Sequence, residues 1–349
     1  MNRSVMTLAL AGAILLGLSC LASAITIDTV LINNAGNSPD LETGFGAVSY
    51  TYRMGTTEVT VAQYTAFLNA VAADDQAQLW SPWMAPSFVD PVGTIARDGL
   101  PGSYTYSVIG AANHPITYVD WGDAARFANW LHNGQPTGPQ DASTTEAGAY
   151  SLNGGTSVDH LNAVSRNVGA TWFLPSENEW YKAAYHQNNG PSGNYWDYPT
   201  ATDATPVAEG PPGGTNSANY DNVVATTFFG LGMTDVRAYL DSPGPYGTFD
   251  QAGNLMEWTE GIESPWLDGA FARGMRGGAW STTADTLHAS FGVYVNDPKL
   301  AGIDTGFRVA TVPEPSTLTL TVAGFSLVFV LRVYSRARRT ARLTNQSTN

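Results

Sequence analysis

The position of its only cysteine constrains this chain more than any other feature. Cys20 lies within the first 24 residues, and no cysteine follows it in the 349-residue sequence. A domain folded from the later residues has no internal disulfide and no thiolate metal site, so a packed core must hold it. The chain supplies 10 Trp, 16 Tyr and 13 Phe for such a core, which argues against disorder as its main state.

Residues 1–24 have the pattern of a secretory signal peptide. Arg3 provides a positive charge, residues 8–18 are apolar, and the small residues 22–24 form a cleavage site. The pattern predicts an exported protein that begins at Ile25, with residues 25–44 as a lead-in to the folded domain. An uncleaved anchor is the alternative, although the apolar run is short for a membrane span.

The C-terminal residues 312–349 combine three features in order. Val312-Pro313-Glu314-Pro315 precedes an apolar segment, predicted to be transmembrane over 318–334, and arginines follow at 336, 338, 339 and 342. The basic cluster should stay in the cytoplasm, which leaves the preceding domain outside. This tail resembles the PEP-CTERM sorting signal, and the resemblance implies processing by an exosortase-type enzyme of a bacterium. A buried terminal helix is the alternative.

Acidic residues dominate the part of the chain between these two signals. Residues 25–316 hold 10 Lys and Arg against 30 Asp and Glu, a formal charge of −20. A surface of this kind repels nucleic acid and anionic lipid, so no nucleic-acid partner is expected. The charge suits solubility or the binding of cations.

Apolar periodicity predicts three helices, and strand signals are shorter. The helices begin at residues that can cap an N-terminus: Thr60 and Ser176, each with a capping-box partner three residues later, and Asp120, whose helix ends near His132. Strands are predicted within residues 48–54, 279–280, 291–295 and 306–310. With long Gly- and Pro-rich loops between them, these elements predict an α+β domain with little regular secondary structure.

Five short motifs occur in a fixed order, and Gly306-Phe307-Arg308 follows them. They are Met54-Gly55-x-x-Glu58-Val59-Thr60, Pro115-Ile116-x-x-Val119-x-Trp121-x-Asp123-Ala124, Leu174-Pro175-Ser176-Glu177-x-Glu179-Trp180, Gly253-Asn254-x-x-Glu257-Trp258 and Arg276-Gly277-Gly278-x-Trp280. The ordered set resembles the formylglycine-generating enzyme, or sulfatase-modifying factor, family over residues 45–311. The resemblance implies that family's fold, a variant of the C-type lectin fold.

One motif offers the donors for a calcium ion. Asp250 and Glu257 supply carboxylates, and Gly253 and Leu255 supply carbonyl oxygens between them, a set of hard oxygen ligands that suits Ca²⁺. A buried carboxylate needs a partner of some kind. A turn cap, or an ion pair with an arginine such as Arg276, is therefore the alternative role for Glu257.

The resemblance adds expectations about metals. It implies that these four residues bind structural calcium and that a second calcium site begins at Asn219 and the Tyr220 carbonyl. In catalytic family members, two cysteines after the motif Arg276-Gly277-Gly278 hold copper. Their places here, counted forward from the motif, fall on Thr282 and Leu287. Neither side chain supplies the thiolate that copper(I) selects, so neither copper nor the formylglycine reaction is expected.

Other catalytic patterns are weaker. The five histidines include no pair at helical i, i+4 spacing, and no G-x-S-x-G nucleophile elbow occurs. Glu177 and Glu179 are a carboxylate pair of the kind that cleaves glycosides. Their position in a predicted capping box explains them better.

These observations predict a non-catalytic domain at the bacterial cell surface or in the extracellular matrix, which contacts the membrane through residues 318–334 before processing. We expect it to be stabilised by calcium and to bind an extracellular glycan or protein. The aromatic loops Trp80-Ser81-Pro82-Trp83 and Tyr195-Trp196-x-Tyr198 are candidate contact surfaces. The alternative is an enzyme of the same family with altered, cysteine-independent chemistry, which a pocket of converging ionisable groups near Thr282 and Leu287 would favour.

Overall fold

The computed structural model describes residues 24–86, 94–224, 232–263 and 272–312. The predicted signal peptide up to residue 23 and the tail from residue 313, with its predicted transmembrane segment 318–334, lie outside these residues. Within the described part, no helix is both long enough and apolar enough to cross a bilayer.

One sheet brings the two ends of the described chain together. Its strand order is β1 (Thr29–Ile32), β2 (Tyr52–Gly55), β12 (Ala310–Thr311) and β5 (Trp172–Phe173). Strand β2 lies antiparallel to β1 on one side and to β12 on the other, with Met54 opposite both Val30 and Ala310. The predicted lead-in 25–44 is thus part of the fold, because it supplies β1.

A second sheet carries the motifs of the C-terminal half. Its order is β10 (Tyr294–Asn296), β9 (Ala272–Arg276), β8 (Met256–Glu263) and β11 (Thr305–Gly306), and only the β8–β11 pair is parallel. Phe307 and Arg308 follow β11 directly and precede β12 of the first sheet, so this buried segment joins the two sheets. Two-stranded sheets are formed by β3 (Ile95–Asp98) with β4 (Thr105–Val108) and by β6 (Val207–Ala208) with β7 (Ser217–Ala218).

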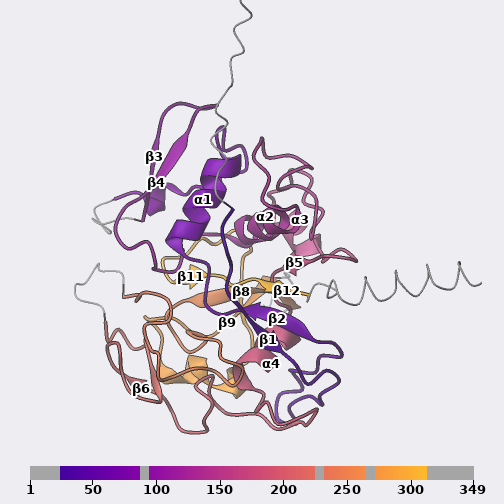
Figure 1. The fold of residues 1–349 in the computed structure, drawn as a ribbon, viewed down its shortest axis with the longest axis vertical. Helices are drawn as coiled ribbons and strands as arrows, with labels where there is room; N and C mark the ends of the chain where they lie inside the picture. The colour runs from indigo at the N-terminus through magenta and orange to yellow at the C-terminus, as the bar shows by residue number, and fades with distance from the viewer. Residues whose placement is uncertain (1–23, 87–93, 225–231, 264–271, 313–349) are drawn as a thin grey trace, which may run out of the picture.

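The three predicted helices are confirmed, and a short fourth one is added. They are α1 (Val61–Val71), α2 (Trp121–His132) and α4 (Glu177–Tyr185), each with a complete capping box at its N-terminus. The added helix α3 (Val158–Ala163) begins after Ser157, whose hydroxyl accepts from the His160 N–H. In Figure 1, α1, α2 and the β3–β4 hairpin lie at one end of the molecule, and the loops between α4 and β8 fill the other.

The strand predictions were less accurate. The prediction for residues 279–280 was wrong, because Gly277 and Gly278 have φ of 99° and 68° and turn the chain out of the sheet. The predicted strands at 48–54 and 291–295 overlap β2 and β10 only at their ends. The predicted strand at 306–310 is divided between β11 and β12.

Aromatic side chains from α1 and α2 form the centre of the main core. Phe127 stacks on Tyr64 with ring centroids 6.1 Å apart and meets Phe67 edge-on at 5.3 Å. Phe307 packs against the same Phe127 ring at 5.4 Å. The core therefore fixes the residue that precedes Arg308, and so helps to place that arginine between the two sheets. Short 3-10 turns at Pro82–Met84, Ala284–Leu287 and Ala289–Phe291 complete the structure.

Candidate functional site

A buried ion pair between Arg308 and Glu257 lies where the two sheets meet. Arg308 Nε donates to Glu257 Oε2 at 2.5 Å, and a terminal guanidinium nitrogen donates to Oε1 at 2.6 Å. Both side chains are completely buried. Trp180 of α4 donates its indole N–H to Glu257 Oε2 at 2.7 Å. Glu257 therefore accepts three hydrogen bonds, and the pair has the bidentate geometry that gives strong charge-assisted bonds.

The remaining donors of Arg308 bind backbone carbonyls of two other segments. They reach the Gly55 carbonyl of β2 at 3.0 Å and the Phe249 carbonyl at 2.9 Å. Burial by itself would lower the pKa of Arg308, but the Glu257 carboxylate outweighs burial and raises it. The arginine is thus charged and links β2, β8 and the loop at residue 249.

Two further carboxyl groups lie beside this pair without a cation of their own. Glu58, which precedes α1, is buried, and its Oε1 accepts from the Asn254 side-chain amide at 3.1 Å. Its Oε2 has no donor among the described residues, and it faces Asp250. Asp250 Oδ2 accepts from the Arg237 N–H at 2.5 Å. Three acids therefore surround one arginine, and two facing carboxylates need a proton or a cation between them.

The pKa values follow from this crowding. Burial, followed by the negative charges of Asp250 and Glu257, raises the pKa of Glu58 well above its ordinary value. Burial also raises the pKa of Asp250 to about 6, against the opposing effect of the Arg237 N–H. The sequence analysis assigned Glu58 no role. A single acid in the otherwise uncharged segment Met54–Thr60 was the available signal, but Asp250, which it faces, lies 192 positions away in the sequence.

The predicted calcium loop is present, but Glu257 is oriented differently from the prediction. Its carboxylate faces Arg308 and Trp180, so the ion-pair alternative describes it better, with Arg308 in place of the suggested Arg276. Arg276 instead pairs with Glu177 at 2.5 Å. Among the described residues, no group of three or more His, Cys, Asp or Glu side chains is arranged to hold a metal ion. Calcium binding at Asp250, Gly253, Leu255 and Glu257 stays a prediction.

The second predicted site adjoins the first. Gly253 forms a bridge to Asn219, and a Cβ atom at Gly253 would lie 2.1 Å from the Asn219 carbonyl oxygen, so only glycine fits there. The Asn219 side-chain amide donates to Asn254 Oδ1 at 3.1 Å, whereas its own Oδ1 is buried with no donor from the described residues. An unsatisfied amide oxygen next to the Tyr220 backbone is compatible with a hard cation.

Thr282 and Leu287, the positions assigned to the family's cysteines, both lie close to Gly278. A Cβ atom there would lie 3.0 Å from Thr282 Oγ1 and 2.8 Å from Leu287 Cδ2. Thr282 Oγ1 accepts from the Ala279 N–H at 2.9 Å and lies 2.7 Å from Thr286 Oγ1. Leu287 is fully buried among apolar residues, packed with Tyr198, Ala218, Tyr220 and Ala252. The hydroxyl pair of Thr282 and Thr286 and the side chain of Leu287 therefore fill the space beside Gly278.

The capping-box explanation of Glu177 and Glu179 is confirmed. Glu179 accepts from the Ser176 N–H at 2.7 Å and also binds Arg166 at 2.6 Å, while Glu177 binds Arg276. Both carboxylates are thus held by structural partners.

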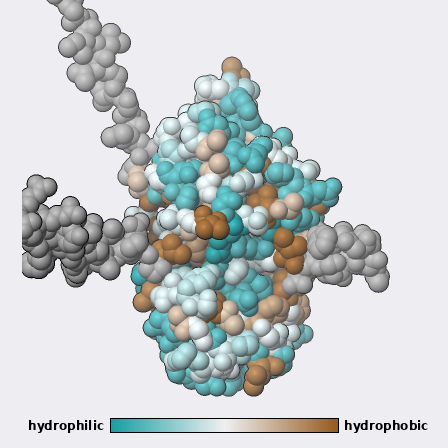
Figure 2. Space-filling model, turned by 90° about the vertical axis from the view of Figure 1, so that its right-hand side faces the viewer, coloured by the Kyte–Doolittle hydropathy of each residue, from teal (hydrophilic) through white to brown (hydrophobic). Residues whose placement is uncertain are grey.

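In the two aromatic loops, Trp80 and Tyr198 are buried, whereas Tyr195 and Trp196 are partly exposed. Trp80 lies under the Arg97 guanidinium at 4.0 Å and is 9% exposed, and Tyr198 belongs to the apolar cluster around Leu287. Trp83, by contrast, is 55% exposed. On the face shown in Figure 2, hydrophilic residues predominate and apolar residues form small separate groups. Trp83 is therefore the residue of these loops that is most available for contact.

Removing one partner of the central ion pair should destabilise the fold strongly. Arg308→Met leaves Glu257 buried without its cation, a change that costs about 3–5 kcal/mol in comparable pairs. Urea denaturation at pH 7 measures it. The pair of Lys299 with Asp120, 3.6 Å apart, gives the control, because the Lys299 side chain is 45% exposed and Lys299→Met should cost less than about 1 kcal/mol. Equal effects of the two substitutions would refute a central role for Arg308.

The raised pKa of Asp250 predicts a particular pH dependence in the presence of EDTA. The unfolded chain loses this proton near the ordinary pKa, while the folded chain keeps it up to about pH 6. The free energy of unfolding should therefore fall as pH rises from about 4 to about 6. Asp250→Asn should flatten this part of the profile in urea denaturation between pH 4 and 7. Parallel profiles for the wild type and the variant would contradict the assignment.

Comparison with known proteins identifies the family. Residues 46–312 match the sulfatase-modifying factor enzyme 1-like domain. The crystal structure of CarF is 21% identical, with a TM-score of 0.51, and the match covers 83% of this chain and 100% of CarF. Treponema denticola variable protein 1 is 18% identical, with a TM-score of 0.50, over 84% of this chain and 97% of its own. No curated protein matches.

These matches confirm the predicted α+β fold of the formylglycine-generating-enzyme type. At such low identities the solved structures bear on the fold alone, whereas the family match spans more than half of the sequence. The chain belongs to the family of sulfatase-modifying factor enzyme 1-like domains.

Proposed function

We propose that this chain is an exported, non-catalytic member of its family, which uses the fold as a scaffold to bind an extracellular protein or glycan. The observation that carries the proposal is the packing above Gly278. There, Thr282 bonds to neighbouring backbone and hydroxyl groups and Leu287 is fully buried. These side chains offer no thiolate, and copper(I) chemistry depends on soft ligands of that kind.

Export and anchoring complete the proposal. The signal-peptide pattern at residues 1–24 and the PEP-CTERM-like tail at 312–349 support secretion, followed by processing at the membrane by an exosortase-type enzyme. Both ends of the described chain reach the β1–β2–β12 sheet. Figure 1 shows these strands near the middle of the molecule, with the loops between α4 and β8 at the end opposite α1 and α2.

Calcium is the cofactor we propose, in a structural role. Asp250 and Glu58 carry carboxylates that Arg308 does not neutralise, because Arg308 is bound to Glu257. Asn219 adds an amide oxygen without a donor from the described residues. Ca²⁺ bound by such oxygens would compensate the charge of the buried acids and stabilise the loop that follows Asp250.

A direct assay tests the proposed lack of catalysis. The purified protein, supplied with copper and a cysteine-containing sulfatase peptide, should form no formylglycine detectable by mass spectrometry. An active formylglycine-generating enzyme under the same conditions is the positive control. Appearance of the aldehyde at a rate that depends on this protein would show that it is an enzyme.

Removal of calcium should lower the melting temperature of the protein. A ligand present at about 100 times its Kd stabilises the folded state by about 2.7 kcal/mol, so EDTA should produce a measurable downward shift that added Ca²⁺ reverses. Asp250→Asn should abolish the shift, and Asp241→Asn, at an exposed position, should preserve it. An unchanged melting temperature in excess EDTA would argue against bound calcium.

A further inference from the structure

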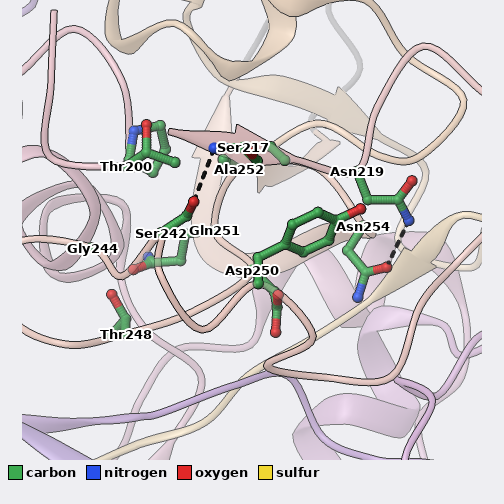
Figure 3. A pocket seen from close by; sticks show the side chains of 13 residues that line it. Thr200, Ser217, Asn219, Ser242, Gly244, Thr248, Asp250, Gln251, Ala252 and Asn254 are labelled. Carbon is green, nitrogen blue, oxygen red and sulfur yellow. Dashed lines mark hydrogen bonds between the residues drawn. The ribbon is translucent and has the colours of Figure 1, made fainter. Parts of the chain in front are cut away.

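A small polar cavity lies between the loops on the α4 side of the second sheet. It is lined by residues 199–200 and 217–219, by Tyr239, Ser242, Gly244 and Thr248, and by residues 250–252 and Asn254. Figure 3 shows that its polar groups fall at two ends, with Asn219 and Asn254 at one end and Thr248, Gly244 and Gln251 at the other. Asn219 and Asn254 at the first end belong to the predicted calcium loops, and Gln251 at the second end directly follows the predicted ligand Asp250 in the sequence.

Two buried oxygens at this second end have no hydrogen-bond partner among the described residues. They are Thr248 Oγ1, on a side chain with no exposed surface, and Gln251 Oε1, on a side chain only 2% exposed. The other hydroxyls of the cavity are satisfied: Thr200 binds Asn216, Ser217 binds Glu209, and Ser242 binds the Gly214 carbonyl. Because an unsatisfied buried polar atom is costly, these two oxygens indicate a missing partner.

Gly244 packs closely beside Thr248 Oγ1, where no larger side chain would fit. A Cβ atom at this position would lie 2.6 Å from Thr248 Oγ1 and 3.1 Å from the Pro199 carbonyl oxygen. The φ of Gly244 is not in the left-handed region, so its backbone does not require glycine. Position 244 therefore requires glycine because a side chain would collide with Thr248 Oγ1 and the Pro199 carbonyl oxygen.

The donor set has a definite chemistry. A hydroxyl, an amide carbonyl and a peptide carbonyl are neutral, hard oxygen ligands, and the Gln251 amide nitrogen is turned away toward the Trp180 carbonyl at 3.4 Å. Asp250 lines the same cavity and adds negative charge nearby. Neutral oxygens in this arrangement can replace the hydration shell of a monovalent ion, whereas calcium sites generally include coordinating carboxylates.

We propose that Thr248, Gln251 and the Pro199 carbonyl form a binding site for one monovalent alkali cation, Na⁺ or K⁺, beside Gly244. The ion would satisfy both orphaned oxygens and would hold the loop at 199–200 against the segment 244–251. None of its three oxygens is among the calcium ligands proposed above, although Asp250 lines the same cavity, and the site does not depend on whether the domain is catalytic.

Thermal unfolding of the purified full-length protein tests the site. In EDTA and at constant ionic strength, replacing choline chloride by NaCl or KCl should raise the melting temperature by about 2–4 °C, with saturation as the cation concentration rises. Thr248→Val, which removes the hydroxyl at nearly constant volume, should abolish the rise. Thr200→Val, at a paired hydroxyl of the same cavity, should leave the rise intact.

A second pair of variants tests the space itself. Gly244→Ala should remove the cation response, and Gly210→Ala, whose Cβ would meet nothing within 4 Å, should retain it. If the melting temperature of the wild type is the same in choline, Na⁺ and K⁺, water alone fills the space and the proposal is wrong. It is also wrong if the response persists in Thr248→Val or in Gly244→Ala.

Discussion

The Arg308–Glu257 ion pair connects more of this structure than any other interaction described above. Arg308 binds β8 through Glu257, β2 through the Gly55 carbonyl and the loop at residue 249 through the Phe249 carbonyl. Trp180 of α4 donates its indole N–H to the same carboxylate and so connects this helix to the pair. Burying two charges is costly, and a pair of this kind is stable only when every donor and lone pair finds a partner. In a chain without a disulfide after Cys20, this network is a long-range polar constraint that adds to the apolar core.

The same ion pair explains the unusual electrostatics around it. Because Arg308 binds Glu257, the carboxyl groups of Glu58 and Asp250 face each other without a cation of their own. Burial raises the pKa of both groups. Charge neutrality then requires a proton or a metal ion. The set of short motifs thus has a physical basis, because the motifs around Glu58, Trp180, Glu257 and Arg308 each contribute one member of a single buried cluster.

Short sequence patterns predicted the helix starts correctly but did not predict which distant residues pair with each other. The capping residues Thr60, Asp120 and Ser176 begin three helices because an N-cap bond depends on residues only three positions apart. The strands at 279–280 and 306–310 were misplaced, since glycine turns and the passage of Phe307 and Arg308 between sheets depend on tertiary packing. The pairing of Glu257 with Arg308 likewise depends on the three-dimensional structure. Sequence spacing alone did not distinguish Arg308 from Arg276 as the partner.

We propose that packed side chains, Thr282 and Leu287, occupy the two positions that carry copper-binding cysteines in catalytic members of the family. Competition with a chromogenic Cu(I) chelator measures this directly. The account predicts that the wild-type protein leaves copper with the chelator, whereas a Thr282→Cys, Leu287→Cys double variant, whose side chains meet above Gly278, withdraws about one ion per chain. Stoichiometric withdrawal of Cu(I) by the wild-type protein would contradict the account.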